Sequence, residues 1–193
     1  NNTYSFKKID ATHIGLHFGS FGTFGGNANT TQTWGAHYLN VGVSVLGSEN
    51  DYEYVGKNKR NVHGQFTRFS AQVNEARKLK RGVASWNSEY SYNHRNFSGS
   101  LNTLGKDSYK DVATRNLWQI QQTTGGIQTT VRAAHLFEQY RYYPDSEKPL
   151  YDEGRANTFI SGFETEVFLL KKIRLLGKLE YTYVTAKGSN VGE

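Results

Sequence analysis

The sequence contains no cysteine, no methionine and only two prolines in 193 residues. The absence of cysteine excludes a disulfide framework, a thiol nucleophile and a cysteine-based metal site. No stretch approaches the ~20 apolar residues of a membrane-spanning helix, so any crossing of a membrane must be made by strands. Hydrophobic residues make up only 36% of the chain, and its mean hydropathy is −0.68. Both values are low for a soluble core and ordinary for a barrel whose strands have one wet face.

The chain has instead a composition that forms strands. It contains 13 Tyr, 11 Phe and 20 Gly, and abundant aromatic residues with little proline favour strands over helices. Lys and Arg number 23 against 17 Asp and Glu, which gives a formal net charge of +6. A basic chain can bind nucleic acid, anionic lipid or anionic cargo. Because the positive charges are dispersed, solvated loops or a basic rim are favoured, and nucleic acid is not expected as a partner.

Alternation of apolar and polar residues is the clearest local signal. In 14–18 and again in 39–45, every second residue is apolar and those between are small or polar. Such a period of two is typical of a strand with one face against an apolar medium and the other against water. The period does not tell which of the two faces points outward.

The residues from 159 to 183 predict a hairpin with a three-residue turn near 170–173. Before the turn, apolar residues share one parity while Glu164 and Glu166 fall on the other. After the turn, apolar residues again share a face, and Lys178 falls on the opposite one. An odd number of turn residues keeps both apolar sets on one side of the sheet. The hairpin then places Lys178 opposite one of the two glutamates, depending on the register.

Further segments have strand character, and the connections between them are polar and rich in Gly, Asn, Asp and Ser. Long and short connections roughly alternate, as external loops and periplasmic turns do in outer-membrane barrels. The whole chain, 1–193, is therefore predicted to be a single all-β domain, an antiparallel up-and-down β-barrel of about eight to ten strands. Two segments, 66–79 and 112–121, also have apolar residues at helical spacing. The additional strand candidates are 4–9, 62–79, 83–98, 112–122 and 127–142, with 52–57 marginal.

The stretch YDEGRANTFISGFETEVFLLKKIRLLGKLEYTYVTAKGSN, residues 151–190, consists of an Arg-bearing loop, a long strand, a tight turn and a strand that ends in Tyr-x-Tyr. This stretch resembles the penultimate hairpin of many Gram-negative outer-membrane β-barrels. Among them are the barrel domains of surface lipoprotein assembly modifiers and of polysaccharide exporters. The resemblance implies an outer-membrane barrel and carries no functional residue over to this chain.

No motif for covalent chemistry is present. The sequence has no phosphate-binding glycine loop, no nucleophile elbow and no zinc-binding helix motif, so neither catalytic residues nor enzymatic activity is expected. In a barrel, the charged positions of the last hairpin would line the lumen and set its electric field. Carboxylates opposite a lysine on a polar strand face favour cross-strand pairs over acid–base catalysis. These lumen-lining candidates are Glu164, Glu166, Arg174, Lys178 and Glu180.

Histidine and tyrosine residues supply the candidates for ligand binding. His13 and His17 share one strand face, and imidazoles can ligate haem or a metal. Residues four apart in a strand stand about 13 Å apart, too far to share one small ion, and no metal site is expected. Tyrosines near residues 90 and 140 fit either an interfacial girdle, which a barrel favours, or a ligand-stacking surface, which a soluble protein favours. These tyrosines are Tyr90, Tyr92, Tyr140 and Tyr142.

Two functions are consistent with these patterns. The first is an outer-membrane β-barrel that forms a pore or translocation channel, with membrane lipid as its partner, an anionic or protein cargo, and no cofactor. The second is a secreted or cell-surface β-barrel or sandwich that binds haem, a glycan or a host protein. The low apolar fraction and the charge-free apolar faces favour the first. The two differ in whether residues such as Val43, Phe163 and Leu179 face lipid or pack together inside.

Overall fold

The computed structural model describes residues 4–100, 102–169 and 173–189, and within them the chain is all-β. The described residues form no helix, so none is long and apolar enough to cross a membrane. Nine strands build the main sheet, and a short hairpin of β4 (Glu53–Tyr54) and β5 (Lys59–Arg60) lies apart from it. The nine are β1 (Asp10–Gly19), β2 (Thr23–Trp34), β3 (His37–Ser48), β6 (Phe66–Leu79), β7 (Gly82–Asn96), β8 (Ser108–Thr124), β9 (Ile127–Tyr143), β10 (Asp152–Leu169) and β11 (Ile173–Gly188).

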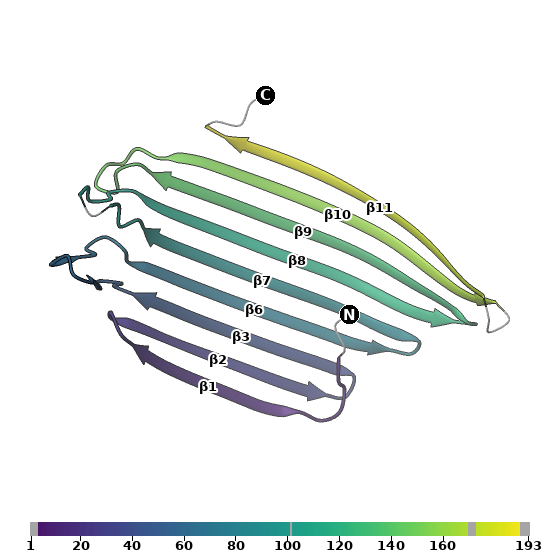
Figure 1. Cartoon of the computed structure of the whole chain (residues 1–193). Coiled ribbons are helices and arrows are strands. Elements are labelled where there is room, and N and C mark those ends of the chain that lie inside the picture. The colour runs from purple at the N-terminus through teal and green to yellow at the C-terminus, as the bar shows by residue number, and fades with distance from the viewer. Residues whose placement is uncertain (1–3, 101, 170–172, 190–193) are drawn as a thin grey trace.

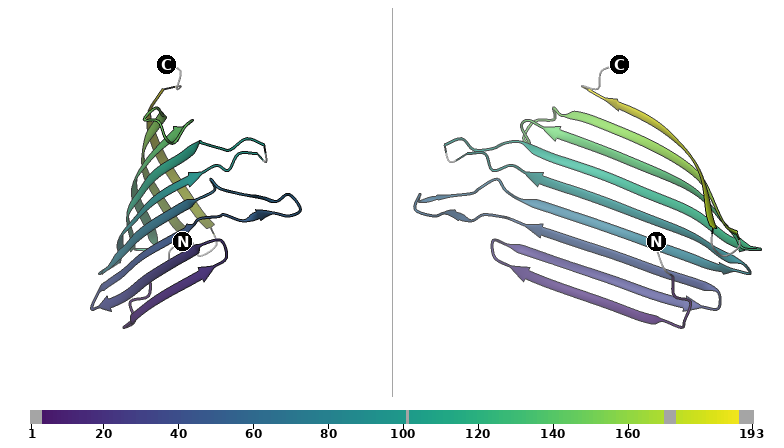
Figure 2. Two further views of the ribbon diagram at one scale, coloured as in Figure 1. Left: turned by 90° about the vertical axis from the view of Figure 1, so that its left-hand side faces the viewer. Right: turned by 45° about the vertical axis from the view of Figure 1, so that its right-hand side comes forward.

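Each strand of the main sheet pairs antiparallel with the next, in the order β1-β2-β3-β6-β7-β8-β9-β10-β11 (Figure 1). This meander confirms the antiparallel up-and-down arrangement expected from the alternation. The predicted closure into a barrel is not seen, because β1 and β11 are the two edges of the sheet in the described part of the chain. The sheet is strongly twisted along its length (Figure 2), as right-handed strand twist requires.

Connections differ systematically between the two ends of the sheet. At one end, which we call the short-turn end, two-residue turns follow β2, β6 and β8. At the other, the long-loop end, three of the four connections are long, and one carries the β4–β5 hairpin (Figure 1). Gly125 and Gly126 both have positive φ, 59° and 82°, which is the conformation of a tight type I′ hairpin turn.

Of the predictions for single segments, some are confirmed and some are wrong. Residues 66–79 and 112–121 are strand, so the helical alternative for both is wrong. Segment 4–9 is not a strand; it leaves the edge of the sheet before β1 begins. The last hairpin pairs as expected, with Glu164 opposite Lys178. Its turn, 170–172, lies outside the described residues.

The register sorts side chains into two faces that run unbroken across all nine strands. For example, Val43 is opposite Ala28 on β2 and Ala71 on β6. We define the apolar face as the side of the sheet that carries Ile14, Leu16, Phe18, Val41, Val43, Val45, Phe69, Val73, Trp118, Ile120, Val131, Phe159, Phe163, Val167, Leu175, Leu179, Tyr181 and Tyr183. We define the polar face as the opposite side, which carries His13, His17, Asn27, Asn29, Asn40, Gln72, Asn74, Glu89, Arg115, Arg132, Glu138, Glu164, Glu166, Arg174, Lys178 and Glu180.

No layer covers the apolar face in the part of the chain that the structure describes. Val43 is 44% exposed, Phe163 46% and Leu179 72%. The only hydrophobic side chain buried among the described residues is Ala76, on the polar face. The sheet therefore has no internal hydrophobic core, and its large apolar side chains are free to contact another medium.

Candidate functional site: the polar face

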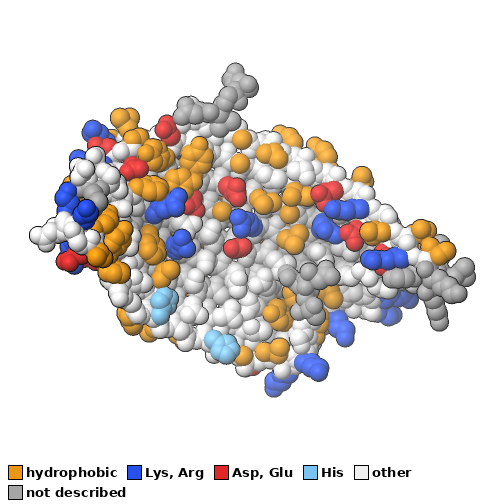
Figure 3. Space-filling view, in the orientation of Figure 1, with side chains coloured by type: hydrophobic (Ala, Val, Ile, Leu, Met, Phe, Trp, Pro, Cys, Tyr) orange, Lys and Arg blue, Asp and Glu red, His pale blue; other side chains and the backbone are white. Residues whose placement is uncertain are grey.

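Several hollows lie along the polar face, which Figure 3 shows. A cavity of about 220 Å³ lies over β2, β3, β6 and β7, and one of about 490 Å³ lies over β7–β11 near the long-loop end. A third, of about 600 Å³, lies near the short-turn end. Polar side chains that line hollows of this size can hold water or a ligand.

One part of this face, over β1–β3 and β6, is built mainly from amides, hydroxyls, histidines and glycines. We call it the neutral half. Asn40, only 9% exposed, is its centre. The Asn40 Nδ2 donates to Asn29 Oδ1 at 3.0 Å and to Thr31 Oγ1 at 2.8 Å, and Asn40 Oδ1 accepts from Asn74 Nδ2 at 3.2 Å. Both ends of this buried amide are thus satisfied, as burial of a polar group demands.

The other part, over β7–β11, carries acidic and basic side chains in close pairs, and we call it the charged half. Arg115 lies between two carboxylates, 4.0 Å from Glu89 and 3.7 Å from Glu138. Arg132 Nη2 donates to Glu164 Oε2 at 2.9 Å. Figure 3 shows the contrast: red and blue side chains lie side by side in the middle of the face, whereas white and pale blue dominate over β1–β3.

The five predicted lumen-lining residues all lie in the charged half. Arg174 pairs with Glu166 at 2.7 Å, and Lys178 pairs with Glu180 at 3.0 Å. Glu164 is opposite Lys178 in the register, yet its ion pair is with Arg132 on the other neighbouring strand. The sequence pattern predicted the face but left the register open between Glu164 and Glu166, and it did not show that the strand at 127–142 lies beside β10.

The histidine and tyrosine candidates are spread over the sheet. His13 and His17 share the polar face as expected, opposite Asn29 and Gly25. Within the residues that the structure describes, no group of three His, Asp or Glu side chains could hold a metal ion. Ligand binding by His13 and His17 stays a prediction.

The two tyrosine pairs lie on opposite faces of the sheet. Tyr90 and Tyr92 are on the apolar face, opposite Ala71 and Phe69 of β6. Tyr140 and Tyr142 are on the polar face. The two pairs therefore lie in different surroundings, and both the girdle and the ligand-stacking alternatives stay predictions.

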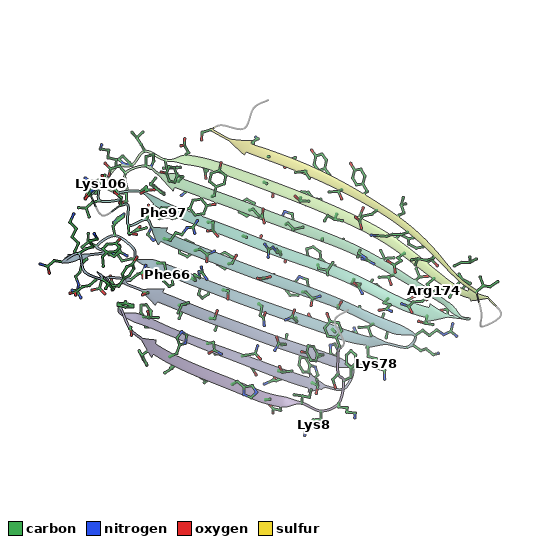
Figure 4. All side chains as sticks on the ribbon, in the orientation of Figure 1. Lys8, Phe66, Lys78, Phe97, Lys106 and Arg174 are labelled. Carbon is green, nitrogen blue, oxygen red and sulfur yellow. The ribbon has the colours of Figure 1, made fainter. Side chains whose placement is uncertain are left out.

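Aromatic and basic side chains gather at the long-loop end (Figure 4 labels Phe66, Phe97 and Lys106 there). Tyr109 and Tyr140 stack with ring centroids 6.1 Å apart, and the Arg95 guanidinium lies 5.3 Å from the Tyr109 ring. The Tyr140 ring occupies the space that a Cβ at Gly154 would need. Such aromatic and cation–π contacts stiffen the rim of the hollow.

Sequence reasoning missed the Asn40 network and the Arg115 cluster. Both were detectable in principle, because each lies at the polar parity of a strand that alternates. What could not be read from one strand is that these residues become neighbours across the sheet. Residues 4–9 alternate in sequence, but nothing in that alternation shows that they contact the polar face instead of pairing as a strand.

No protein-family model matches the sequence, and no curated protein is similar to it.

Proposed function

We propose that this chain forms the wall of a Gram-negative outer-membrane β-barrel whose polar face lines an aqueous passage for ions or cargo. Passage or docking is its mechanism, without covalent chemistry. The observation that carries the proposal is the uncovered apolar face. Large apolar side chains exposed over nine strands are costly in water and favourable in hydrocarbon.

The distribution of charge along the apolar face supports a membrane position. On the described strands, the middle of this face, such as Val112–Ile120 on β8, carries no Asp, Glu, Lys or Arg. Its charged residues lie at the two ends: Asp10, Glu75 and Arg77 at the short-turn end, and Lys110, Arg141, Glu153, Arg155 and Lys187 at the long-loop end. A charge-free band of ~9–11 residues per strand is what a membrane-crossing strand needs.

Aromatic side chains lie toward the two ends of the apolar face. Trp34, Trp86 and Trp118 lie toward the short-turn end. Tyr90, Tyr92, Tyr181 and Tyr183 lie toward the long-loop end. Tyrosine and tryptophan collect at membrane–water interfaces because their rings are apolar and their tips polar. The two aromatic zones therefore fit the two borders of a bilayer.

The alternative, a secreted or surface protein that binds a ligand, requires the apolar residues to pack against each other. The exposure of Val43, Phe163 and Leu179 weighs against it, as does the pairing of Lys178 and Glu180 on the hollowed side.

A closed wall also requires pairing of both edges. Because nine antiparallel strands leave β1 and β11 running in the same direction, an antiparallel closure requires an odd number of further strands between them.

Adjacent residues on opposite faces give the direct test. Val43→Arg places a charge in the proposed lipid contact and is expected to lower the free energy of unfolding in bilayers by about 2–4 kcal/mol. The matched control is Ser44→Arg, one residue along β3 on the polar face, with an expected cost below about 1 kcal/mol. Urea titration in lipid vesicles measures both. Equal costs, or recovery of the protein as a monomer without detergent, would overturn the membrane assignment.

Conductance tests the passage itself. Glu138→Gln removes a carboxylate from the polar face, whereas Glu75→Gln removes one from the apolar face. In planar bilayers the first is expected to shift the reversal potential in a salt gradient toward anion selectivity, and the second to leave it unchanged, because only lumenal charges set the field of a pore. The same shift in both variants would contradict the assignment of the faces.

A further inference from the structure

Residues 4–9 cross the polar face near the short-turn end, and we call them the strap. The strap is clamped to β2 where it meets β1: Thr33 N donates to Ile9 O at 2.9 Å, and Thr33 Oγ1 donates to Lys7 O at 2.8 Å. Beyond this clamp the chain leaves the sheet edge. Figure 1 shows it passing across the neighbouring strands.

Tyr4 anchors the far part of the strap. Its hydroxyl donates to Asn87 Oδ1 on β7 at 3.0 Å, and its ring meets Tyr38 of β3 edge-on, with centroids 5.4 Å apart. The strap therefore spans the face from β2 to β7. Tyr38 is opposite Ala76 in the register, and this is where the one buried hydrophobic side chain of the described residues lies.

The strap borders two hollows without filling them. Tyr4 and Phe6 line the cavity of about 600 Å³, which extends over β7–β10. Phe6 also lines a cavity of about 490 Å³ over the turn between β6 and β7. The two aromatic residues are half-buried while Ser5 and Lys7 between and beyond them are exposed. The strap thus presents every second side chain to the sheet, as an extended peptide does.

The wall of the larger cavity suits a polypeptide backbone. It contains the amides of Gln119, Gln121 and Gln128, together with the half-buried pair of Arg132 and Glu164. Each glutamine amide offers a donor and an acceptor, which are the groups that a peptide unit presents. An extended segment lying here can exchange hydrogen bonds with these amides and place rings in the hollows.

The geometry points to a peptide-binding groove on the polar face, which takes an extended segment with aromatic side chains at alternate positions and which the strap occupies in part. The strap is the chain's own competitor for the groove. As a tethered segment it acts at a millimolar effective concentration, so a free peptide binds well only when the strap is released. The inference concerns one face of the sheet and does not require the sheet to be closed or to conduct.

The test uses a fluorescein-labelled peptide of sequence YSFKKI, which matches residues 4–9, and the full chain in detergent. Tyr4→Ala with Phe6→Ala releases the strap, and the peptide is expected to bind about tenfold more tightly than to the wild type, because the competent fraction rises. The matched control, Ser5→Ala with Lys7→Ala, changes only exposed side chains and should bind as the wild type. Fluorescence anisotropy reads the affinity, and circular dichroism verifies the strand content.

A locked strap supplies the opposite arm. Because the chain has no cysteine, Tyr4→Cys and Asn87→Cys can be joined by a short bismaleimide linker, and the linked protein is expected to lose peptide binding. The inference is overturned if the released variant binds no better than the wild type, if the linked protein still binds, or if the peptide ASAKKI binds equally well. Peptide binding without conductance would leave the groove intact and remove only the passage.

Discussion

The two halves of the polar face differ in how their polar side chains are paired. Both must keep polar groups satisfied in a hollow, but the neutral half does so with short amides around Asn40, and the charged half with ion pairs such as Arg132–Glu164. In the neutral half, glycines leave room for neighbouring side chains to lie flat: the His17 ring lies over Gly25, and Asn29 and Gln72 approach Gly42. In the charged half, longer side chains reach across strands to their partners.

The difference indicates that the stability of the sheet and the electric field of the hollow depend on different groups of side chains. An amide network depends on geometry and is indifferent to salt, because its groups are neutral. Ion pairs that are partly exposed contribute little stability and are screened by salt, yet they dominate the electric field of the hollow. We therefore expect the neutral half to hold the sheet together and the charged half to select what approaches it.

The largest expected effect is at Asn40. Asn40→Leu removes the shared partner of Asn29 and Asn74 and should lower the free energy of unfolding by about 2–3 kcal/mol, because several buried hydrogen bonds are lost at once. Asn102→Leu, at an exposed loop position, is the control and should change stability by less than about 0.5 kcal/mol. Urea titration in detergent measures both. If both variants change the free energy of unfolding by the same small amount, the neutral half does not stabilise the sheet as proposed.

A smaller effect is expected in the charged half. Arg132 and Glu164 are 33% and 31% exposed, so Arg132→Leu should cost about 1 kcal/mol after allowance for solvent screening. The control, Arg155→Leu, removes a more exposed cation, 3.5 Å from Glu153, and should cost less. Raising the salt from about 0.05 to 0.5 M should shrink the cost at Arg132 but not at Asn40. If the cost of substitution depends on salt at both positions, the two halves do not differ as proposed.

The smallest effect is expected at Asp145, in the loop between β9 and β10. The backbone N–H of Glu147 donates to Asp145 Oδ1 at 3.1 Å, and this bond, followed by the Lys148 ammonium at 3.2 Å, holds the pKa of the carboxyl below its usual value. A carboxyl with a lowered pKa contributes order above its ordinary pKa and loses it as the pH falls through the lowered one. Hydrogen-exchange protection of the Glu147 amide should therefore fall on acidification, and Asp145→Asn should abolish this pH dependence. Protection that is constant with pH in the wild type would rule this out.

Strand positions and face assignments were largely predictable. The parity of residues 39–45 and of the segment around Glu164 and Glu166 placed each side chain on the face where the structure has it. The helical spacing within 66–79 was misleading because Phe69 and Val73 also share one face of a strand, whereas Phe66 falls on the other, and only pairing with β3 and β7 decides between the two structures. Segment 4–9 was wrongly predicted as a strand. Its residues do alternate, but the alternate side chains contact the polar face, and the segment forms no strand of the sheet.

Alternation along the chain determined that this protein is built of strands with one apolar and one polar face, and the short connections between them favoured antiparallel pairing. Only the tertiary structure decided which polar groups meet, such as Arg132 with Glu164 and Tyr4 with Asn87. It also decided that the apolar side remains uncovered and the polar side is hollowed. These properties arise from cross-strand neighbours, curvature and twist, which no single segment of sequence contains.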